Sequence, residues 1–188
     1  MPLYSGIKNR VAFIGEIGVG KSYMAKWLEK NHGYKVFSFA RGLKEIAVEY
    51  YEMKHAAKDR KLLQTLGDAM RSVDKNVFAR KTVKDIAEYE AQGYPKRVVV
   101  DDLRFDNEKE ALTNIRGSKF VIIRLKSRLV EEGYNDHKDE HISEEESRKM
   151  LVDYEINSGD FESLMDIIKI LFCFHMDIGK IQIQILVD

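Results

Sequence analysis

Residues 11–22 read Val-Ala-Phe-Ile-Gly-Glu-Ile-Gly-Val-Gly-Lys-Ser. Four of them fit the Walker A pattern Gly-x-x-x-x-Gly-Lys-Ser/Thr, namely Gly15, Gly20, Lys21 and Ser22. The apolar run before the glycines predicts a buried strand, and the residues after Ser22 carry apolar side chains at helical spacing. A strand, a glycine loop and a helix in this order aim backbone N–H groups and the positive end of the helix at one anion. The stretch therefore predicts a site for a nucleoside triphosphate.

The expected cofactors are ATP and Mg²⁺. Lys21 would reach the β- and γ-phosphates, and the Ser22 hydroxyl would ligate Mg²⁺. The loop residues expected to bind ATP are Gly15, Gly18, Val19, Gly20, Lys21 and Ser22. Lys21 is also the first candidate catalytic residue.

Length and composition limit the class of protein. The chain has 188 residues, which suits one domain with a sizeable core. Its 31 basic and 31 acidic residues balance, so we expect no broad nucleic-acid footprint and no basic membrane patch. The single cysteine, Cys173, excludes an internal disulfide and is expected in the core. The first ten residues lack the apolar segment of a signal peptide, and no apolar run reaches the length of a membrane span. We expect a soluble cytoplasmic protein.

Strands and helices alternate along the chain, which indicates an α/β fold of three layers with a mainly parallel, five-stranded sheet. Strands are expected at 11–14, 36–39, 98–100, 120–125 and 152–156, and helices at 23–31, 41–51, 62–67, 77–91, 108–115 and 161–171. The domain is expected to cover residues 1–173, with a charged lid at about 126–149, followed by an extension, 174–188. Residues 181–187 alternate with period two and indicate a strand, which could be an added edge strand, a homodimer contact or a tail.

Two carboxylates end the valine run of residues 97–102, Arg-Val-Val-Val-Asp-Asp. Three consecutive β-branched residues indicate a strand covered on both faces, and ligands bind at the carboxyl ends of such strands. We assign Asp102 to the Mg²⁺ shell, directly or through water, as a Walker B carboxylate. Adjacent strand residues point to opposite faces, so only one of Asp101 and Asp102 is expected to face the phosphates. The alternative is an aspartate that caps the next turn.

The basic residues indicate the type of reaction, because phosphoryl transfer needs cations around both substrates. Those of interest are Arg41, Lys44, Arg71, Arg80 and Arg104, with Arg124, Lys126 and Arg128 beside the charged segment. A mobile cationic lid would keep water from the γ-phosphate. His137 and His141 also invite a zinc site, but the His-Glu-x-x-His order is missing, which favours a solvated lid. The Asn/Thr-Lys-x-Asp motif of a regulatory GTPase does not occur after a central strand.

Four ordered segments resemble motifs of the deoxynucleoside monophosphate kinases found in bacteriophages. Residues 102–108, Asp-Leu-Arg-Phe-Asp-Asn-Glu, resemble that family's Asp-x-Arg-Phe-x-Asn-Glu signature. Residues 38–44 resemble its Phe-Ala-x-x-Leu-Lys, and residues 63–71 its Leu-Gln-x-x-Gly-x-x-x-Arg. Residues 141–144, followed by 157–159, resemble its His-x-Ser-Glu and its later Asn-x-Gly.

The likeness covers most of residues 10–172 and implies a P-loop kinase that transfers the γ-phosphate of ATP to a (deoxy)nucleoside 5′-monophosphate. The likeness implies that Arg41 and Lys44 border the acceptor and that Arg71 binds the acceptor's phosphate. It implies that Arg104 lies beside the reacting groups and that Arg128 is the lid residue for the transferred phosphoryl group. Asn157 is implied to lie near the adenine of ATP. Arg41 and Gly42 depart from the family, which often has Asp and Pro there, and this bears on acceptor choice. The segment from Phe174 onward has no counterpart. A phage-encoded enzyme would act in the host cytoplasm.

Two other functions fit the same residues. The first is a kinase of another small molecule, with a hydroxyl or phosphate acceptor; for a hydroxyl, Asp101 or Asp102 would have to receive a proton. A monophosphate needs no such base, because its second pKa near 6 leaves it largely dianionic at neutral pH. The second is a nucleotide-binding switch that hydrolyses ATP slowly and acts on a protein partner, with residues 181–187 as the contact.

Overall fold

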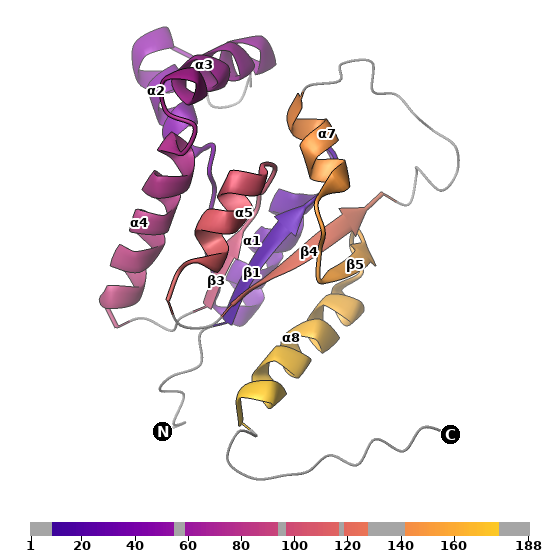
Figure 1. Cartoon of the computed structure of the whole chain (residues 1–188). Coiled ribbons are helices and arrows are strands. Elements are labelled where there is room, and N and C mark those ends of the chain that lie inside the picture. The colour runs from indigo at the N-terminus through magenta and orange to yellow at the C-terminus, as the bar shows by residue number, and fades with distance from the viewer. Residues whose placement is uncertain (1–8, 55–58, 94–96, 117–118, 128–141, 177–188) are drawn as a thin grey trace.

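The computed structural model describes residues 9–54, 59–93, 97–116, 119–127 and 142–176. Its centre is a sheet of five parallel strands in the order β2-β3-β1-β4-β5 (Figure 1). The strands are β1 (Asn9–Ile14), β2 (Lys35–Phe37), β3 (Arg97–Val100), β4 (Phe120–Lys126) and β5 (Tyr154–Asn157). This arrangement confirms the predicted α/β class and the parallel five-stranded sheet.

The central strand, β1, fixes the place of the phosphate loop. Val11 of β1 lies opposite Val99 of β3 and Val121 of β4, and all six residues of β1 are buried. The chain builds β2 and β3 on one side of β1 and then crosses it to build β4 and β5 on the other. The carboxyl end of β1 is therefore the point at which the strand order reverses, where open α/β sheets bind their ligands.

Helices surround the sheet, with α2 and α3 together at one end of the molecule and α4 leading away from them (Figure 1). The described helices are α1 (Lys21–His32), α2 (Arg41–Tyr51), α3 (Arg60–Val73), α4 (Val77–Ala91), α5 (Asp106–Thr113), α7 (Ile142–Lys149) and α8 (Phe161–Met176). Within the described residues, none of the helices combines the length and the apolar character that crossing a membrane requires.

The sheet is the middle of three layers, and an apolar core on each of its faces joins it to a layer of helices. On one face of the sheet, Val11 and Phe13 of β1 belong to a core shared with α1 and α8. On the other face, Ala12 and Ile14 belong to a core shared with α2, α4 and α5. Alternate residues of one strand point to opposite faces, so β1 contributes to both cores.

Two elements differ from their predicted bounds for visible reasons. β2 ends at Phe37 instead of Phe39, because the backbone N–H of Phe39 turns out of the sheet and donates to Asp102 at 2.7 Å. Helix α3 does not end at Gly67 but continues to Val73. A Cβ on Gly67 would lie 3.3 Å from Leu43 Cδ2, so this glycine lets α3 approach α2 closely.

The ends of the predicted domain fall in different places. Helix α8 continues to Met176, so the boundary expected after residue 173 lies inside a helix. The last part of the expected lid is helix α7. The central part of that lid, residues 128–141, and the strand expected at 181–187 lie outside the described residues.

Candidate active site

Glycines shape the loop that joins β1 to α1. Gly15 has φ +148° and Gly20 has φ +93°, values that L side chains rarely adopt. A Cβ on Gly15 would also lie 2.6 Å from the carbonyl oxygen of Leu125, so the loop passes closely against β4. Val19 holds the loop from inside, because its side chain is buried in the core that contains α1. The loop thereby sets the first turn of α1 at the carboxyl end of β1.

Lys21 lies within this loop. Its Nζ donates to the carbonyl oxygen of Gly15 at 2.6 Å and to that of Glu16 at 2.7 Å, and the residue is 7% exposed. The ammonium group therefore adds its charge to the positive end of α1. Together with the loop N–H groups, this arrangement favours a polyphosphate anion.

Asp101 lies against the first turn of α1. The Ser22 hydroxyl donates to Asp101 Oδ2 at 2.6 Å. Asp101 Oδ1 is buried and has no hydrogen-bonding partner among the residues that the structure describes. Burial, and then the nearby Asp102 carboxylate, raise the pKa of Asp101, while the hydrogen bond from Ser22 and the charges of Lys44 and Lys21 oppose the rise. Mg²⁺ prefers oxygen ligands, and the free carboxylate oxygen beside a serine hydroxyl fits such an ion.

Asp102 makes contacts of a different kind. Its carboxylate accepts hydrogen bonds from Ser38 Oγ at 2.5 Å, from Phe39 N at 2.7 Å and from Ala40 N at 3.0 Å. These bonds fix the loop between β2 and α2. The structure therefore places Asp101, and not Asp102, beside Ser22, because the two neighbours turn to opposite sides after β3. Asp102, which the sequence analysis assigned to the Mg²⁺ shell, thus binds the loop after β2, and Asp101 is the carboxylate that contacts Ser22.

A cavity of about 480 Å³ opens next to the phosphate loop. Its walls come from the phosphate loop, the loop between β2 and α2, one face of α3, and the start of α5. The residues that line it are Ile17, Gly18, Gly20, Lys21, Ser22, Tyr23, Phe39, Ala40, Leu43, Lys44, Arg60, Leu63, Gln64, Arg71, Phe78, Asp101, Asp102, Arg104, Phe105 and Glu108. Cations and carboxylates thus share the cavity with an apolar, partly aromatic wall.

Arg71 packs against two aromatic rings of this cavity. Its guanidinium carbon lies 5.5 Å from the ring centre of Phe78 and 4.7 Å from that of Phe105. Nη2 also donates to Asp68 at 2.7 Å, and the side chain is 21% exposed. A guanidinium fixed in this way can offer its N–H groups to a phosphate in a defined orientation.

Glu108 is a functional candidate to which the sequence analysis gave no separate role. It is 4% exposed, and its Oε2 accepts the backbone N–H groups of Arg104 at 3.0 Å and Phe105 at 3.2 Å. Burial, and then the Asp102 carboxylate, raise the pKa of Glu108 to about 8. Glu108 is therefore mainly a neutral acid at pH 7. Its last position in the motif of residues 102–108 was the signal that could have drawn attention to it.

The other expected residues fall in three places. Lys44 and Arg104 line the cavity. Arg41 lies outside it, pairs with Glu45 at 2.9 Å, and lines a separate hollow of about 260 Å³. Asn157 ends β5, next to Ser158, whose Oγ lies 2.6 Å from a Cβ built on Gly20. Asn157 is thus on the β4–β5 side of the phosphate loop, whereas the cavity extends towards β2 and α3.

Helix α7 brings a further cation to the loop. Arg148 Nε lies 3.4 Å from Glu16 Oε1, and Glu16 belongs to the phosphate loop. Arg124 of β4 holds the end of this helix by donating to the carbonyl oxygens of Ser147 at 2.9 Å and Met150 at 2.6 Å. In the sequence, the only sign of this contact was that Arg124 interrupts the apolar run of β4. Three expected residues, Arg128, His137 and His141, lie outside the described residues.

Comparison with known proteins gives one sequence relative. No family model matches the chain. Over 116 residues the chain is 32% identical to an uncharacterized protein, ORF77, of Ictalurid herpesvirus 1 (strain Auburn). The match covers 61% of this chain and 50% of that protein, so the chain spans about half the length of the curated relative it matches.

Solved structures extend the comparison to the fold. The chain is similar to a gluconokinase from Sinorhizobium meliloti 1021, with a TM-score of 0.50 and 12% identity over 92% of this chain and 99% of that one. It is also similar to a sugar kinase from Janibacter sp. HTCC2649, with a TM-score of 0.50 and 13% identity over 88% of this chain and 95% of that one. These likenesses show that the chain has a P-loop kinase fold.

Proposed function

We propose that the protein is a nucleotide kinase, which transfers the γ-phosphate of ATP to a (deoxy)nucleoside 5′-monophosphate and releases ADP and the diphosphate. The deoxynucleoside monophosphates are the first candidates, because of the motif likeness of residues 38–44, 63–71 and 102–108 to the phage kinases. The proposal has two halves, a triphosphate site at the phosphate loop and an acceptor site in the cavity beside it.

The observation that carries the proposal is the position of Arg71. A cation packed against Phe78 and Phe105 lines a cavity that begins at the phosphate loop. This arrangement supports a second anionic substrate next to the γ-phosphate, since a guanidinium pairs well with a phosphate. The apolar part of the wall, which includes Leu43 and Leu63, suits the base of a nucleotide.

The chain's own residues supply positioning and charge. Lys21 and the loop N–H groups would hold the triphosphate, while Lys44 and Arg104 would face the acceptor phosphate. Ser22 and Asp101 would hold Mg²⁺, which when bound neutralises charge on the phosphates. No residue has to remove a proton, because the second pKa of a monophosphate is near 6 and its oxygen is already ionised at neutral pH.

The test is ADP formation from ATP and Mg²⁺ with each nucleoside and deoxynucleoside monophosphate added in turn. We expect one or several to stimulate turnover, and we expect Lys21→Ala to abolish the stimulation. Lys26→Ala is the matched control, because Lys26 lies on α1 but is exposed. Tight ATP binding with no stimulation by any monophosphate would refute the proposal.

A kinase with a hydroxyl acceptor is the second candidate. The fold likeness to proteins described as a gluconokinase and a sugar kinase supports it, and so does the raised pKa of Asp101, which suits a proton acceptor. The same assay therefore includes gluconate and common sugars. Turnover with one of these, lost in Asp101→Asn together with the acidic limb of the pH profile, would favour this candidate over the nucleotide kinase.

A further inference from the structure

One face of α3 forms a wall of the cavity. Arg60, Leu63, Gln64 and Arg71 line it, and their spacing of three, four and seven residues puts them on the same side of a helix. Gly67 lies on this side too, in close contact with α2, so the face is held inward. Helix α3 therefore presents three polar side chains to one cavity, Arg60, Gln64 and Arg71. Arg60 lies about one turn from Gln64, and Gln64 about two turns from Arg71.

The spacing of these groups matches the length of a nucleotide. Gln64 and Arg71 are seven residues apart, which is about two turns or roughly 10 Å along the helix axis. Arg71 is fixed against Phe105, three residues after Asp102, so the end of α3 that carries Arg71 lies towards β3. An acceptor whose phosphate binds Arg71 and whose base extends along α3 would bring the base to Leu63 and Gln64.

Gln64 has the chemistry that a base edge requires. Its carboxamide offers a donor and an acceptor side by side, and it makes no hydrogen bond within the described part of the protein. It is also the one side-chain amide among the described residues that line the cavity. Each of the four bases presents a donor next to an acceptor on its pairing edge, but at positions that differ from base to base. A carboxamide held at one place on α3 therefore pairs better with some bases than with others.

We propose that Gln64 is the specificity-determining residue that binds the base edge of the acceptor nucleotide. This inference rests on the proposed function and names the part of the substrate that α3 recognises. It also predicts how a change of donor pattern alters base choice. In Gln64→Glu the ionised carboxylate can only accept hydrogen bonds. Guanine offers two adjacent donors, N1–H and N2–H, whereas thymine offers one donor between two acceptors.

The experiment measures kcat and KM for dGMP, dAMP, dCMP and dTMP with the wild type, Gln64→Glu and Gln64→Leu. We expect Gln64→Glu to raise the ratio of kcat/KM for dGMP over dTMP by about tenfold, mainly through KM. We expect Gln64→Leu to raise KM for every base and to flatten the differences among them. Thr65→Ala is the matched control, because Thr65 is the next residue of α3 and is exposed.

The outcomes separate this inference from the function on which it rests. Turnover in the wild type with an unchanged ranking of bases in both Gln64 variants would overturn the role of Gln64 and leave the nucleotide kinase intact. A wild type that responds to no monophosphate would remove both. If Gln64→Glu does not fold, as judged by its melting curve against Thr65→Ala, the flattened ranking of Gln64→Leu decides the question, and a ranking kept by Gln64→Leu would refute it.

Discussion

Asp101 and Asp102 are neighbours with separate tasks. Asp101 accepts the Ser22 hydroxyl and keeps one buried oxygen without a partner in the described residues, whereas Asp102 accepts three hydrogen bonds from residues 38–40. The first environment suits a ligand of a cation and the second suits a structural anchor. Two isosteric substitutions can separate these roles.

We predict that Asp101→Asn raises the Mg²⁺ concentration needed for half-maximal turnover by about 10- to 100-fold. The stability of this variant should stay close to that of the wild type. Asp102→Asn should instead lower the free energy of unfolding by about 1.5–3 kcal/mol, because it weakens hydrogen bonds to a charged group. Mg²⁺ titration of turnover and urea unfolding of both variants make the comparison. An equal Mg²⁺ requirement in Asp101→Asn and wild type would contradict the assignment.

Glu108 gives the protein a predicted dependence of stability on pH. In the folded state its pKa is about 8, against an ordinary value of 4.5. Between these two values the native state binds more protons than the unfolded state, so the free energy of unfolding falls as pH rises. The slope from this residue is at most about 1.4 kcal/mol per pH unit.

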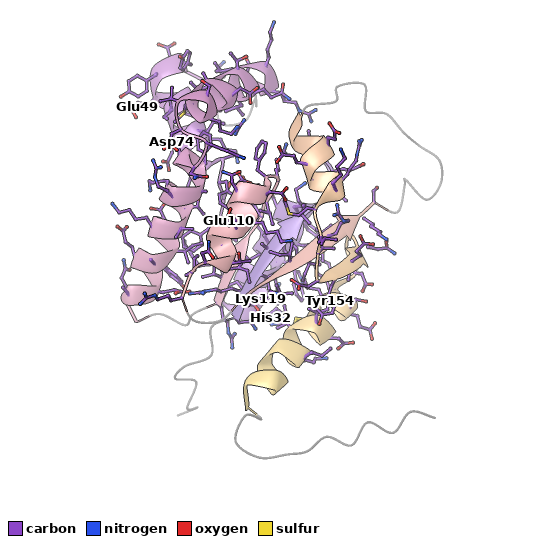
Figure 2. The ribbon with its side chains drawn as sticks, viewed as in Figure 1. His32, Glu49, Asp74, Glu110, Lys119 and Tyr154 are labelled. Carbon is purple, nitrogen blue, oxygen red and sulfur yellow. The ribbon has the colours of Figure 1, made fainter. Side chains whose placement is uncertain are left out.

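Urea unfolding between pH 5 and 8 measures that slope. Glu108→Gln keeps an oxygen that can accept the N–H groups of Arg104 and Phe105 but cannot ionise, so its stability should vary less with pH than that of the wild type. Glu110→Gln is the matched control, since Glu110 lies two residues further along α5 and is exposed (Figure 2). Equal pH slopes for wild type and Glu108→Gln would show that Glu108 ionises normally.

At the scale of elements, α7 depends on one arginine of the sheet. Arg124 binds two carbonyl oxygens at the end of α7, and its Nε lies 3.1 Å from Glu155. We predict that Arg124→Met speeds amide hydrogen exchange across residues 145–150 about 5- to 100-fold, the equivalent of roughly 1–3 kcal/mol. Turnover should fall as well, because α7 carries Arg148 to the phosphate loop.

Lys126→Met is the control for Arg124→Met. Lys126 lies two residues further along β4 and pairs with the same Glu155, at 2.5 Å, yet no described contact joins it to α7. Amide hydrogen exchange in α7 of Lys126→Met should therefore match that of the wild type. If exchange in α7 rises equally in both variants, the ion pairs with Glu155 hold α7 in place, and the hydrogen bonds from Arg124 to the carbonyl oxygens do not.

Elements whose signals are local could be predicted from the sequence. The bounds of α2 and α4 were predicted correctly, because apolar periodicity and the Gly93–Pro95 breaker lie within or beside them. The end of β2 could not be predicted, since the hydrogen bonds that end it come from Asp102, 64 residues from Ser38. The same limit applies to the site. The loop motif was enough to locate Lys21 and Ser22. Contacts between distant elements decide three other features: which of Asp101 and Asp102 lies beside Ser22, the outward turn of Arg41, and the approach of Arg148 to the phosphate loop.

At the scale of the whole molecule, the two ends of the sheet differ in chemistry. The carboxyl end carries the candidate site, and the amino end, where His32 and Lys119 lie, contains a buried ion pair (Figure 2). Arg10 of β1 donates to both carboxylate oxygens of Glu90 on α4, at 2.8 and 2.6 Å, and the two side chains are 0% and 7% exposed. Arg10 also donates to the carbonyl oxygens of Ile115 and Arg116. One side chain thus joins β1 to α4 and to the segment before β4.

We predict that Glu90→Gln lowers the free energy of unfolding by about 3–5 kcal/mol, because it leaves the Arg10 charge buried without its carboxylate. The double variant Arg10→Met, Glu90→Leu should be more stable than Glu90→Gln, since an apolar pair has no charge to desolvate. Glu88→Gln is the matched control: Glu88 is an exposed residue of α4 that pairs with Lys84 at 3.7 Å, and its loss should cost less than about 1 kcal/mol.

The site should not be affected by these changes. Arg10 and Gly15 are five residues apart on an extended strand, which is roughly 17 Å. Turnover per folded molecule, measured well below the melting temperature, should therefore be equal in wild type, Glu90→Gln and the double variant, while urea midpoints differ. A fall in turnover that exceeds the loss of folded protein would mean that the buried pair also sets the position of β1 at the phosphate loop, and the separation of the two ends would then be wrong.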